Sequence, residues 1–444
     1  MNIVIAGCGE VGSHLAKLLA SEDQDIILVD DDSERLARLD ANYNLMTVLG
    51  KPTSFASLKE AGAGSSDLFI AVTPYESNNI LACSIAKKLG AQRTVARIDT
   101  YEFLDPRNER YVKSMGVDSV IYPEYVAAEE IITALNRNWI RNWFELHNGR
   151  IILAGVKIRA GAPIEGMKLR DFASANRNFH VAAIKRNHET IIPRGDDAIT
   201  PGDIVYFTTT HDHIDDLIVI AGKSAFKIRK VFIMGGSKMA VRLVNLAGDR
   251  FKFTIIEENI DVCRQLPAKC HDCEIIHGDG RDSELLQDIG IGDADAFVAL
   301  TGSSEANILT CLTAKELGVR KTVANVESIQ LISQAENLNI GTVVNKKLLA
   351  SSSIFQLLLD ADSSTSKCLA LADAEVAELV VKPGSKLTKA PVKDLKLPRD
   401  LTLAGLIRGD EGRLITGMTQ LLAGDHVLVF CLGGAIHKVE KLFN

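Results

Sequence analysis

Three glycines near the start of the chain have the spacing of a phosphate-binding loop. Gly7, Gly9 and Gly12 follow the apolar stretch "NIVIA" and lead into the helical pattern "GSHLAKLLA". In such a Gly-x-Gly-x-x-Gly loop the first glycine makes the tight turn. The second lets a pyrophosphate approach the backbone, and the third lets the helix pack closely on the strand. The helix start also offers N–H groups and a positive dipole end, so the pattern predicts nucleotide binding.

An acidic residue lies at the distance that this interpretation requires. Asp30 comes 18 residues after Gly12, at the end of the second predicted strand. A carboxylate at that position can accept hydrogen bonds from the hydroxyls of an adenosine ribose, and it repels a 2′-phosphate. The sequence therefore favours NAD or ATP over NADP.

Other residues at the carboxyl ends of predicted strands face the same crevice. Arg97 could reach a terminal phosphate of ATP or the pyrophosphate of NAD, or it could form a surface ion pair with Asp99 or Glu102. Asn79 is either a helix N-cap or a ligand contact. The predicted residues of this edge are Gly50, Thr73, Pro74 and Arg97.

The chain contains this pattern twice. Residues 77–100 and 305–328 are identical at 11 of 24 positions, at a constant offset of 228 that also relates Gly7 to Gly235 and Thr73 to Thr301. A weaker match relates residues 182–203 to 404–425 at an offset of 222. The chain is therefore a tandem duplication, and each half has a larger first part and a smaller second part.

The second copy of the glycine loop is altered. Ser237 and Ala240 replace the second and third glycines, and the serine Cβ obstructs a close phosphate approach. Glu257 still ends the second strand, and Lys238, interpreted as an exposed side chain, adds a positive charge. At the other strand ends Gly278-Asp279-Gly280 replaces Gly50-Lys51-Pro52, and Asn325 replaces Arg97. We expect weaker or different ligand binding at this second site.

Strands and helices alternate in the larger parts, which predicts α/β lobes with Rossmann-like, doubly wound parallel sheets. The smaller parts read as α+β units. The predicted order is a nucleotide-binding lobe at 1–123, a connecting helix at 124–147, a small lobe at 148–225, a degenerate nucleotide lobe at 228–347, a connecting helix or linker at 348–366, and a small lobe at 367–444.

Composition excludes several classes of protein. The net charge of −7 argues against nucleic-acid binding, which needs a positive surface. No apolar run reaches the roughly 18–20 residues of a membrane span, and "MNIVIAGCGE" reads as a strand instead of a signal peptide. The pair Cys270 and Cys273 lacks a second pair of metal ligands, so we predict no metal and leave the role of these thiols open. Neither a metal motif nor a catalytic triad is apparent in the sequence, which favours a ligand sensor over an enzyme.

With these motifs, the chain resembles the TrkA family, the peripheral subunits of Trk-type potassium-uptake systems, built from two tandem RCK (KTN) domains. The resemblance covers essentially the whole chain and rests on "IVIAGCGEVG", "ILVDDD", "LFIAVTPYESNN", "VARI", "FVALTGSSEANI" and "IHGDG". Lys51 departs from the acidic residue frequent in the family. The ligand contacts that the resemblance implies fall on Gly7, Cys8, Gly9, Glu10, Val11, Asp30, Thr73, Pro74 and Arg97, and on Gly235, Gly236, Ser237, Lys238, Met239 and Glu257; Gly12, Gly50, Asp279 and Thr301 complete the candidate residues.

The resemblance also implies a function. The first lobe would bind NAD/NADH or ATP/ADP, with the ligand of the second lobe uncertain. A homo-tetramer would form a ring of eight RCK domains beneath a multi-span potassium-translocating subunit of the TrkH/TrkG type, and nucleotide exchange would gate it. The chain would then be cytoplasmic and peripheral at the inner face of the cell membrane, held by that partner. The alternatives are an NAD-dependent oxidoreductase of unknown substrate and a regulator of another transporter or channel.

Overall fold

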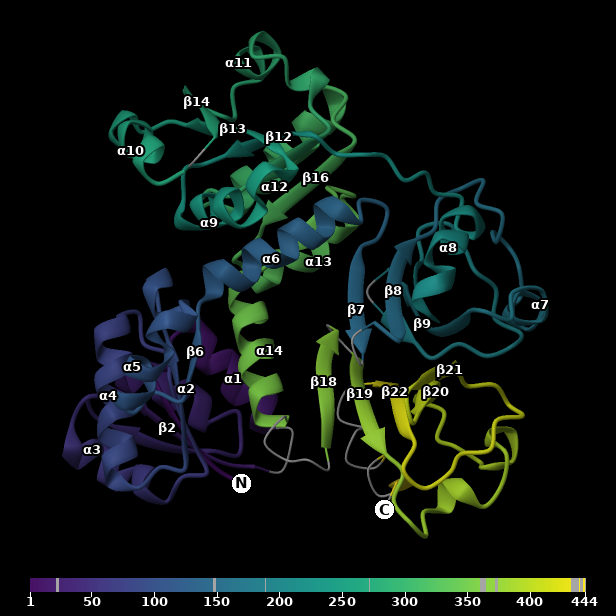
Figure 1. The fold of residues 1–444 in the computed structure, drawn as a ribbon, viewed down its shortest axis with the longest axis horizontal. Coiled ribbons are helices and arrows are strands. Elements are labelled where there is room, and N and C mark those ends of the chain that lie inside the picture. Colours follow the sequence, from purple (N-terminus) through teal and green to yellow (C-terminus); the bar gives the residue numbers. More distant parts are fainter. Residues whose placement is uncertain are drawn as a thin grey trace. The chain divides into compact units, whose positions relative to one another are not determined.

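The computed structural model describes residues 1–20, 24–146, 149–187, 189–270, 272–359, 365–371, 374–432, 439 and 442–443. These residues form two compact units (Figure 1). The first unit contains residues 1–127 together with helix α14 (Lys346–Leu359). The second contains the other described residues from 128 onward.

Residues 2–121 form a six-stranded, all-parallel sheet, which we call the first N-lobe. Its strand order is β3-β2-β1-β4-β5-β6, so the order reverses between β1 and β4, next to the glycine loop. This confirms the predicted doubly wound sheet. Its elements are β1 (Asn2–Ala6), α1 (Glu10–Ala20), β2 (Asp25–Asp30), α2 (Ser33–Asp40), β3 (Met46–Leu49), α3 (Phe55–Glu60), β4 (Leu68–Ala71), α4 (Glu76–Leu89), β5 (Arg93–Arg97), α5 (Glu109–Ser114) and β6 (Ser119–Ile121).

The second N-lobe, residues 230–344, repeats this topology. Its strand order is β14-β13-β12-β15-β16-β17, again all parallel. Its elements are β12 (Lys230–Met234), α9 (Lys238–Ala247), β13 (Lys252–Glu257), α10 (Ile260–Gln265), β14 (Cys273–His277), α11 (Ser283–Asp288), β15 (Ala296–Ala299), α12 (Ser304–Glu316), β16 (Lys321–Asn325), α13 (Ile329–Asn337) and β17 (Thr342–Val344).

Two five-stranded antiparallel sheets form the first and second C-lobes, residues 142–220 and the described residues from 365 onward. Their strand orders, β10-β9-β11-β8-β7 and β18-β19-β22-β20-β21, are the same when one is read backwards. The first C-lobe contains β7 (Asn142–Leu146), β8 (Ile151–Lys157), α7 (Leu169–Ala175), β9 (His180–Arg186), β10 (Glu189–Ile191), β11 (Ile204–Thr209) and α8 (Ile214–Ile220). The second contains β18 (Thr365–Leu371), β19 (Ala374–Val380), β20 (Leu401–Arg408), β21 (Glu411–Leu414) and β22 (His426–Leu432).

One predicted helix is wrong over part of its length. Helix α6 (Pro123–Asn136) ends well before residue 147, and β7 pairs antiparallel with β8. Trp143 packs into one hydrophobic cluster of the first C-lobe, whereas Phe144 packs into another. Adjacent side chains on opposite faces have the period of a strand, so the aromatic residues belong to a sheet and not to a helix. The short edge strand β6 was also absent from the sequence interpretation.

The sheet of the first N-lobe is buried on both faces. Ile3 and Ile5 of β1 belong to one core cluster, and Val4 and Ala6 belong to another. Such near-continuous apolar strands are typical of parallel sheets covered on both sides.

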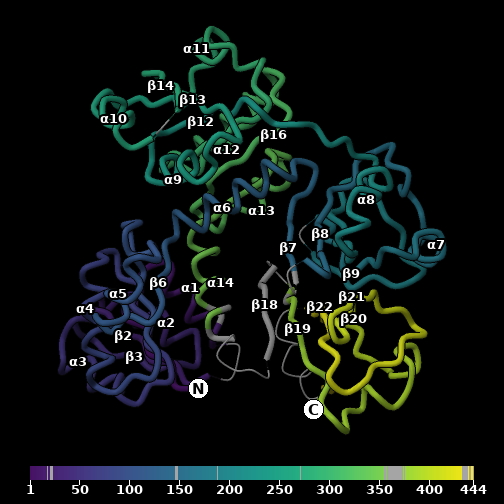
Figure 2. The backbone as a smooth tube through the Cα atoms, viewed as in Figure 1, coloured from purple at the N-terminus to yellow at the C-terminus, as the bar shows by residue number. Residues whose placement is uncertain are grey.

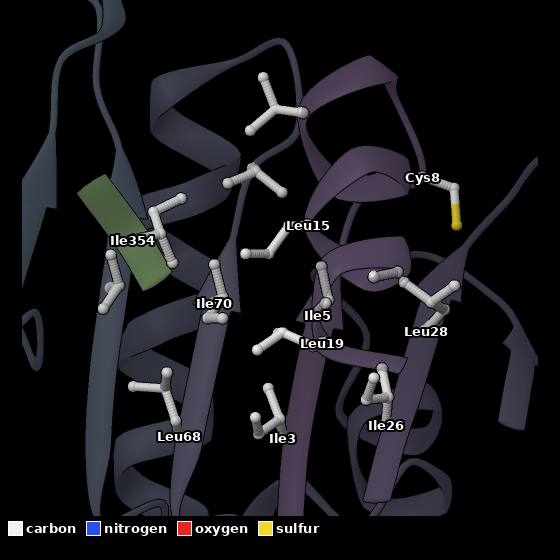
Figure 3. Packing of buried hydrophobic residues seen from close by; sticks show 14 of the residues in the cluster. Ile3, Ile5, Cys8, Leu15, Leu19, Ile26, Leu28, Leu68, Ile70 and Ile354 are labelled. Atoms are coloured by element: carbon white, nitrogen blue, oxygen red, sulfur yellow. The ribbon is translucent and has the colours of Figure 1, made fainter. Parts of the chain in front are cut away.

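Helix α14 comes from the second half of the chain but packs on the first N-lobe. Ile354 of α14 is fully buried in the same cluster as Leu15 of α1 and Ile70 of β4 (Figure 3). Helix α14 follows β17 in the chain and lies beside α1 (Figure 2). Burial of a side chain such as Ile354 stabilises a fold by about 1.5–3 kcal/mol, so α14 is an integral part of this lobe.

Candidate nucleotide-binding sites

Gly7 and Gly12 have the predicted geometric roles. Gly7 has φ +111°, its N–H donates to the Val29 carbonyl at 2.9 Å, and a Cβ there would lie 2.9 Å from the Thr73 nitrogen. A Cβ on Gly12 would lie 1.9 Å from the Gly7 carbonyl oxygen. Neither position tolerates a side chain without movement of backbone. The tight turn and the close approach of helix α1 to the strand are therefore confirmed.

Gly9 differs from its neighbours, because nothing lies within 4 Å of the place where its Cβ would be. Packing within the chain does not explain a glycine at this position. Helix α1 starts at the next residue, Glu10, so the opening lies at a helix N-terminus. Backbone N–H groups and the helix dipole at such a place attract phosphate.

Asp30 holds the glycine loop in place. Its carboxylate is 8% exposed and accepts from the N–H of Cys8 at 2.5 Å and of Asp32 at 2.9 Å. Each carboxylate oxygen has a further lone pair, so hydrogen bonds from ribose hydroxyls remain compatible with this arrangement. Burial, together with the nearby Asp30 charge, raises the pKa of the Cys8 thiol to about 12, and the thiol is therefore neutral at physiological pH.

Asn79 has a role that neither sequence interpretation anticipated. It is fully buried inside α4, where Tyr75 is the N-cap residue, so the N-cap interpretation is wrong. Its amide oxygen accepts from the N–H and hydroxyl of Thr73 at 2.8 and 2.7 Å. Its amide nitrogen donates to the carbonyls of Thr73 and Arg97 at 3.0 and 2.9 Å. Asn79 thus ties together the carboxyl ends of β4 and β5.

Arg97 lies at the same edge with an unsatisfied donor. Its Nη2 lies 3.7 Å from the Asp99 carboxylate, which is an ion-pair distance but too long for a hydrogen bond. Its Nε is buried and has no hydrogen-bond partner among the described residues. Buried donors are nearly always satisfied by protein or by ordered water, so this Nε is available to a water or a ligand.

The other two residues of this edge differ in exposure. Pro74 is exposed just after β4. Gly50 instead packs on α3, because a Cβ there would lie 2.2 Å from the Ser57 hydroxyl oxygen.

The start of α1 has a second set of contacts that the sequence did not predict. Lys347 of α14 forms an ion pair with Glu10, and the Ser351 hydroxyl donates to the Val11 carbonyl at 3.4 Å. Both acceptors lie between Gly9 and Gly12, at the start of α1. The sequence signal for these contacts is the group of lysines and serines in "KKLLASSS", residues 346–353. This pattern does not reveal which lobe the helix contacts.

The second N-lobe has a cavity of about 400 Å³ at the corresponding place. Gly235 has φ +99° and donates to the Ile256 carbonyl at 2.8 Å. The Glu257 carboxylate accepts from the N–H of Gly236 at 2.6 Å, as Asp30 does from Cys8. Asn307 makes the same bonds to Thr301 and Asn325 as Asn79 makes in the first lobe. The framework of the site is thus present twice.

Ser237 is the N-cap residue of α9. Its hydroxyl oxygen accepts from the N–H of Ala240 at 3.3 Å. The serine hydroxyl is therefore bonded to one of the backbone N–H groups that would bind a phosphate in an intact loop. Beside it, Met239 is buried and Lys238 is exposed.

The charges around the second cavity are mainly negative. Its lining includes Glu257, Glu258, Asp279 and the cation Arg281. Arg281 is bound to Asp279 at 2.8 Å and lies 3.5 Å from Glu258, so its charge is largely compensated. Hydrogen bonds from Arg281 lower the pKa of Asp279 and keep it ionised. Such a lining is unfavourable for a polyphosphate.

The two thiols of the cysteine cluster lie at the edge of the second N-lobe. Cys270 is buried, Cys273 begins β14, and neither forms a disulfide. Burial, with Cys273 close by, raises the pKa of the Cys270 thiol to about 12. Within the described residues no cluster of histidine, cysteine and acidic side chains could hold a metal ion. His271 lies outside those residues.

Two known domain families match the chain, each of them twice. The TrkA-N domain matches residues 3–123 and 231–346, and the TrkA-C domain matches residues 153–222 and 376–444. The Trk system potassium uptake protein TrkA of Halomonas elongata is 29% identical over 100% of this chain and 99% of its own. A TrkA homolog of Archaeoglobus fulgidus is 30% identical over 100% of both chains.

Solved structures support the fold. A structure described as the GsuK channel aligns with a TM-score of 0.62 at 16% identity, over 99% of this chain and 78% of that one. One described as the GsuK channel bound to NAD aligns with a TM-score of 0.60, also at 16% identity, over 100% of this chain and 78% of that one. With its paired TrkA-N and TrkA-C domains, the chain belongs to the TrkA family.

Proposed function

We propose that the chain is a nucleotide-sensing regulatory subunit of a potassium-uptake system. The names of its full-length relatives support the association with potassium uptake. No helix in the described part of the chain is both long and apolar enough to span a bilayer. The translocation path would therefore belong to a multi-span partner of the TrkH/TrkG type, with this chain at the inner face of the membrane, as a homo-tetramer.

In the first N-lobe the nucleotide would be NAD(H) or ATP/ADP. The opening at Gly9 carries this proposal, because it leaves the start of α1 accessible beside the point where the strand order reverses. The unsatisfied Nε of Arg97 would meet a phosphate, and Asp30 would receive the ribose hydroxyls. A related fold described as bound to NAD is consistent with this assignment. In the second N-lobe the cap by Ser237 and the acidic lining favour a weaker or different ligand.

Helix α14 would transmit ligand binding in the first N-lobe to the rest of the chain and so to the partner. It contacts Glu10 and Val11, which lie between Gly9 and Gly12 of the loop that would bind phosphate, and it continues the chain from the second N-lobe. A ligand shifts a conformational equilibrium only by its different affinity for the two states. A movement of α1 on ligand binding would alter these contacts and so favour one arrangement of the ring.

A matched pair of variants tests the site in the full-length chain. Gly9→Asp places a carboxylate at the open position, where the new Cβ would have no atom of the protein within 4 Å. Ser237→Asp places the same charge at the corresponding position of the second loop and preserves a good N-cap residue. We expect Gly9→Asp to weaken NADH and ATP binding at least about tenfold, equivalent to about 1.4 kcal/mol, and Ser237→Asp to leave the tighter site unchanged, as measured by calorimetry.

Three outcomes would contradict the proposal. Unchanged nucleotide affinity in Gly9→Asp would remove the first loop as the binding site. Steady consumption of NADH with a small acid or amine would instead indicate the oxidoreductase alternative. Co-purification with a transporter of another ion would indicate a different regulatory target.

A further inference from the structure

A different cavity, separate from both glycine loops, is lined by basic side chains. It has a volume of about 290 Å³ and lies within the second unit, between the first C-lobe and the second N-lobe. The lining residues come from six segments: the connection between α6 and β7, the end of β8 with Arg159, the segment after α8, the end of α12, the start of β16 with Arg320, and the connection between α13 and β17. Its cations are Arg141, Lys157, Arg159, Lys223, Lys315, Arg320 and Lys321.

Four of these cations contact neutral groups. Arg141 donates to the Asn339 side-chain oxygen at 2.9 Å, and Lys315 donates to the Asn339 carbonyl. Lys321 is 5% exposed, and its Nζ donates to the Thr342 hydroxyl at 3.0 Å and the Asn138 carbonyl at 3.3 Å. The Arg320 guanidinium lies 3.8 Å from the ring centre of Phe226.

The other three cations, Lys157, Arg159 and Lys223, have no hydrogen-bonded or ion-paired side-chain partner among the described residues. Two carboxylates face the cluster without forming ion pairs to it. Glu336 attracts Arg141 and Lys157 but is bound to Lys185 at 2.7 Å. Glu130 on α6 attracts Lys321. The described residues thus leave the positive charge of the cavity without ion-paired carboxylates.

Clustering and burial of these cations lower the pKa values of three lysines in the cavity. Burial first, and then repulsion from Arg141 and Lys315, lowers the pKa of Lys321 to about 7. Burial and the neighbouring cations lower those of Lys223 and Lys315 to about 8. An ordinary solvated basic surface would not contain a lysine as buried as Lys321. Clustered groups with such shifts are typical of functional sites.

We propose that this cavity binds a polyphosphate group. Several lysines and arginines from separate segments surround a space near the lower end of the range for small-ligand sites, and phosphate oxygens are the acceptors that such donors favour. The group could be an inorganic polyphosphate or the phosphate chain of a nucleotide. Since its contacts come from both the first C-lobe and the second N-lobe, a bound anion would hold these lobes together.

The test measures binding of tripolyphosphate and of ATP to the full-length chain carrying Gly9→Asp, so that the first glycine loop does not contribute. In that background, Lys157→Gln with Arg159→Gln removes two unpaired, solvent-accessible cations of the cavity. Lys382→Gln with Lys389→Gln removes the same charge from exposed positions outside the cavity lining. We expect at least about a tenfold loss of affinity in the first double variant and less than about a twofold loss in the second.

Proton uptake provides an independent readout. An anion in the cavity favours the charged form of Lys321 and its neighbours, so binding at pH 8 should take up protons. Calorimetry in two buffers of different ionisation enthalpy measures this uptake.

The two ligands distinguish the sources of the phosphate group. Loss of affinity for both tripolyphosphate and ATP in the Lys157→Gln, Arg159→Gln variant supports the shared polyphosphate chemistry, and loss of affinity for ATP alone identifies a nucleotide as the source. Equal losses in the two double variants, or binding without proton uptake, would overturn the proposal.

Discussion

In the first N-lobe the carboxylate of Asp30 accepts from the amide of Cys8, and in the second the carboxylate of Glu257 accepts from the amide of Gly236. The side chains that would face a ligand do not match in this way. Gly9 is replaced by the N-cap residue Ser237, Lys51 by Asp279, and Arg97 by Asn325. The duplication therefore teaches that a loop can keep its backbone framework while its ligand preference changes.

The C-lobes show the opposite pattern, because a buried ion pair is the same in both copies. Arg186 binds Asp203 at 2.8 Å and the Ala198 carbonyl at 2.9 Å. Arg408 binds Asp425 at 2.7 Å and the Gln420 carbonyl at 3.0 Å. Structural bonds are thus shared by both halves, whereas the differences are concentrated at the edges of the parallel sheets.

The largest effect is expected from the asparagines of the shared framework. Asn79→Ala leaves the Thr73 N–H and the Arg97 carbonyl without their partners, and Asn307→Ala does the same in the second lobe. At about 1–3 kcal/mol for each unsatisfied buried group, we expect each variant to lose about 3–5 kcal/mol of local stability. Hydrogen exchange of each lobe measures this loss. A large loss of stability in only one lobe would show that the two asparagines do not have equivalent structural roles.

A smaller effect is expected in the C-lobes. Arg408→Gln leaves Asp425, which is 1% exposed, without its cation, and Arg186→Gln does the same to Asp203. We expect about 2–3 kcal/mol from each, less than for a fully buried pair because the guanidinium groups are about one-third exposed. Thermal denaturation measures the loss of stability in each variant, and unequal losses would show that the two ion pairs are not equivalent.

The Arg408–Asp425 ion pair also predicts how stability depends on pH. Burial alone would raise the pKa of Asp425, but the bonds from Arg408 and the Leu422 N–H lower it below the ordinary value of 3.8. The unfolded state therefore binds the proton more readily, and the contribution of the pair is fully present above about pH 4. It should be lost as the pH falls through the lowered pKa. Arg408→Gln should show a weaker loss of stability between pH 4 and pH 2 than the unchanged chain.

The sequence predicted the two parallel sheets because their strands are apolar throughout and their glycines have strict geometric roles. It did not predict β7, since Trp143 and Phe144 fit either a helix or a strand until the partner strand is known. It also could not predict the contact of Lys347 with Glu10, which joins residues far apart in the sequence. The basic cavity was missed for the same reason, because its cations come from separate segments.

A further comparison exchanges the residues at the end of β5 and β16. Arg97→Asn removes the buried Nε that has no partner, and it introduces the residue of the second lobe. If a phosphate occupies this position, nucleotide affinity should fall about tenfold, or about 1.4 kcal/mol. Asn325→Arg should not create an equally tight site, since the acidic lining of the second cavity remains. Calorimetry on the full-length chain distinguishes these results, and unchanged affinity in Arg97→Asn would leave only the Asp99 ion pair as its role.

The smallest effect is expected from Ser237→Gly, which restores the second glycine of the fingerprint. Loss of the bond from the Ala240 N–H should cost only a few tenths of a kcal/mol, because glycine is itself an acceptable N-cap residue, whereas Ser237→Ala should cost about 1 kcal/mol. If the cap is what keeps phosphate away, Ser237→Gly gains phosphate affinity at the second loop and Ser237→Ala does not. If neither variant gains affinity, then Glu257, Glu258 and Asp279 dominate, and adding Asp279→Lys to Ser237→Gly should produce the gain. Comparing these three variants by calorimetry therefore separates steric occupation of the helix start from the charge around it.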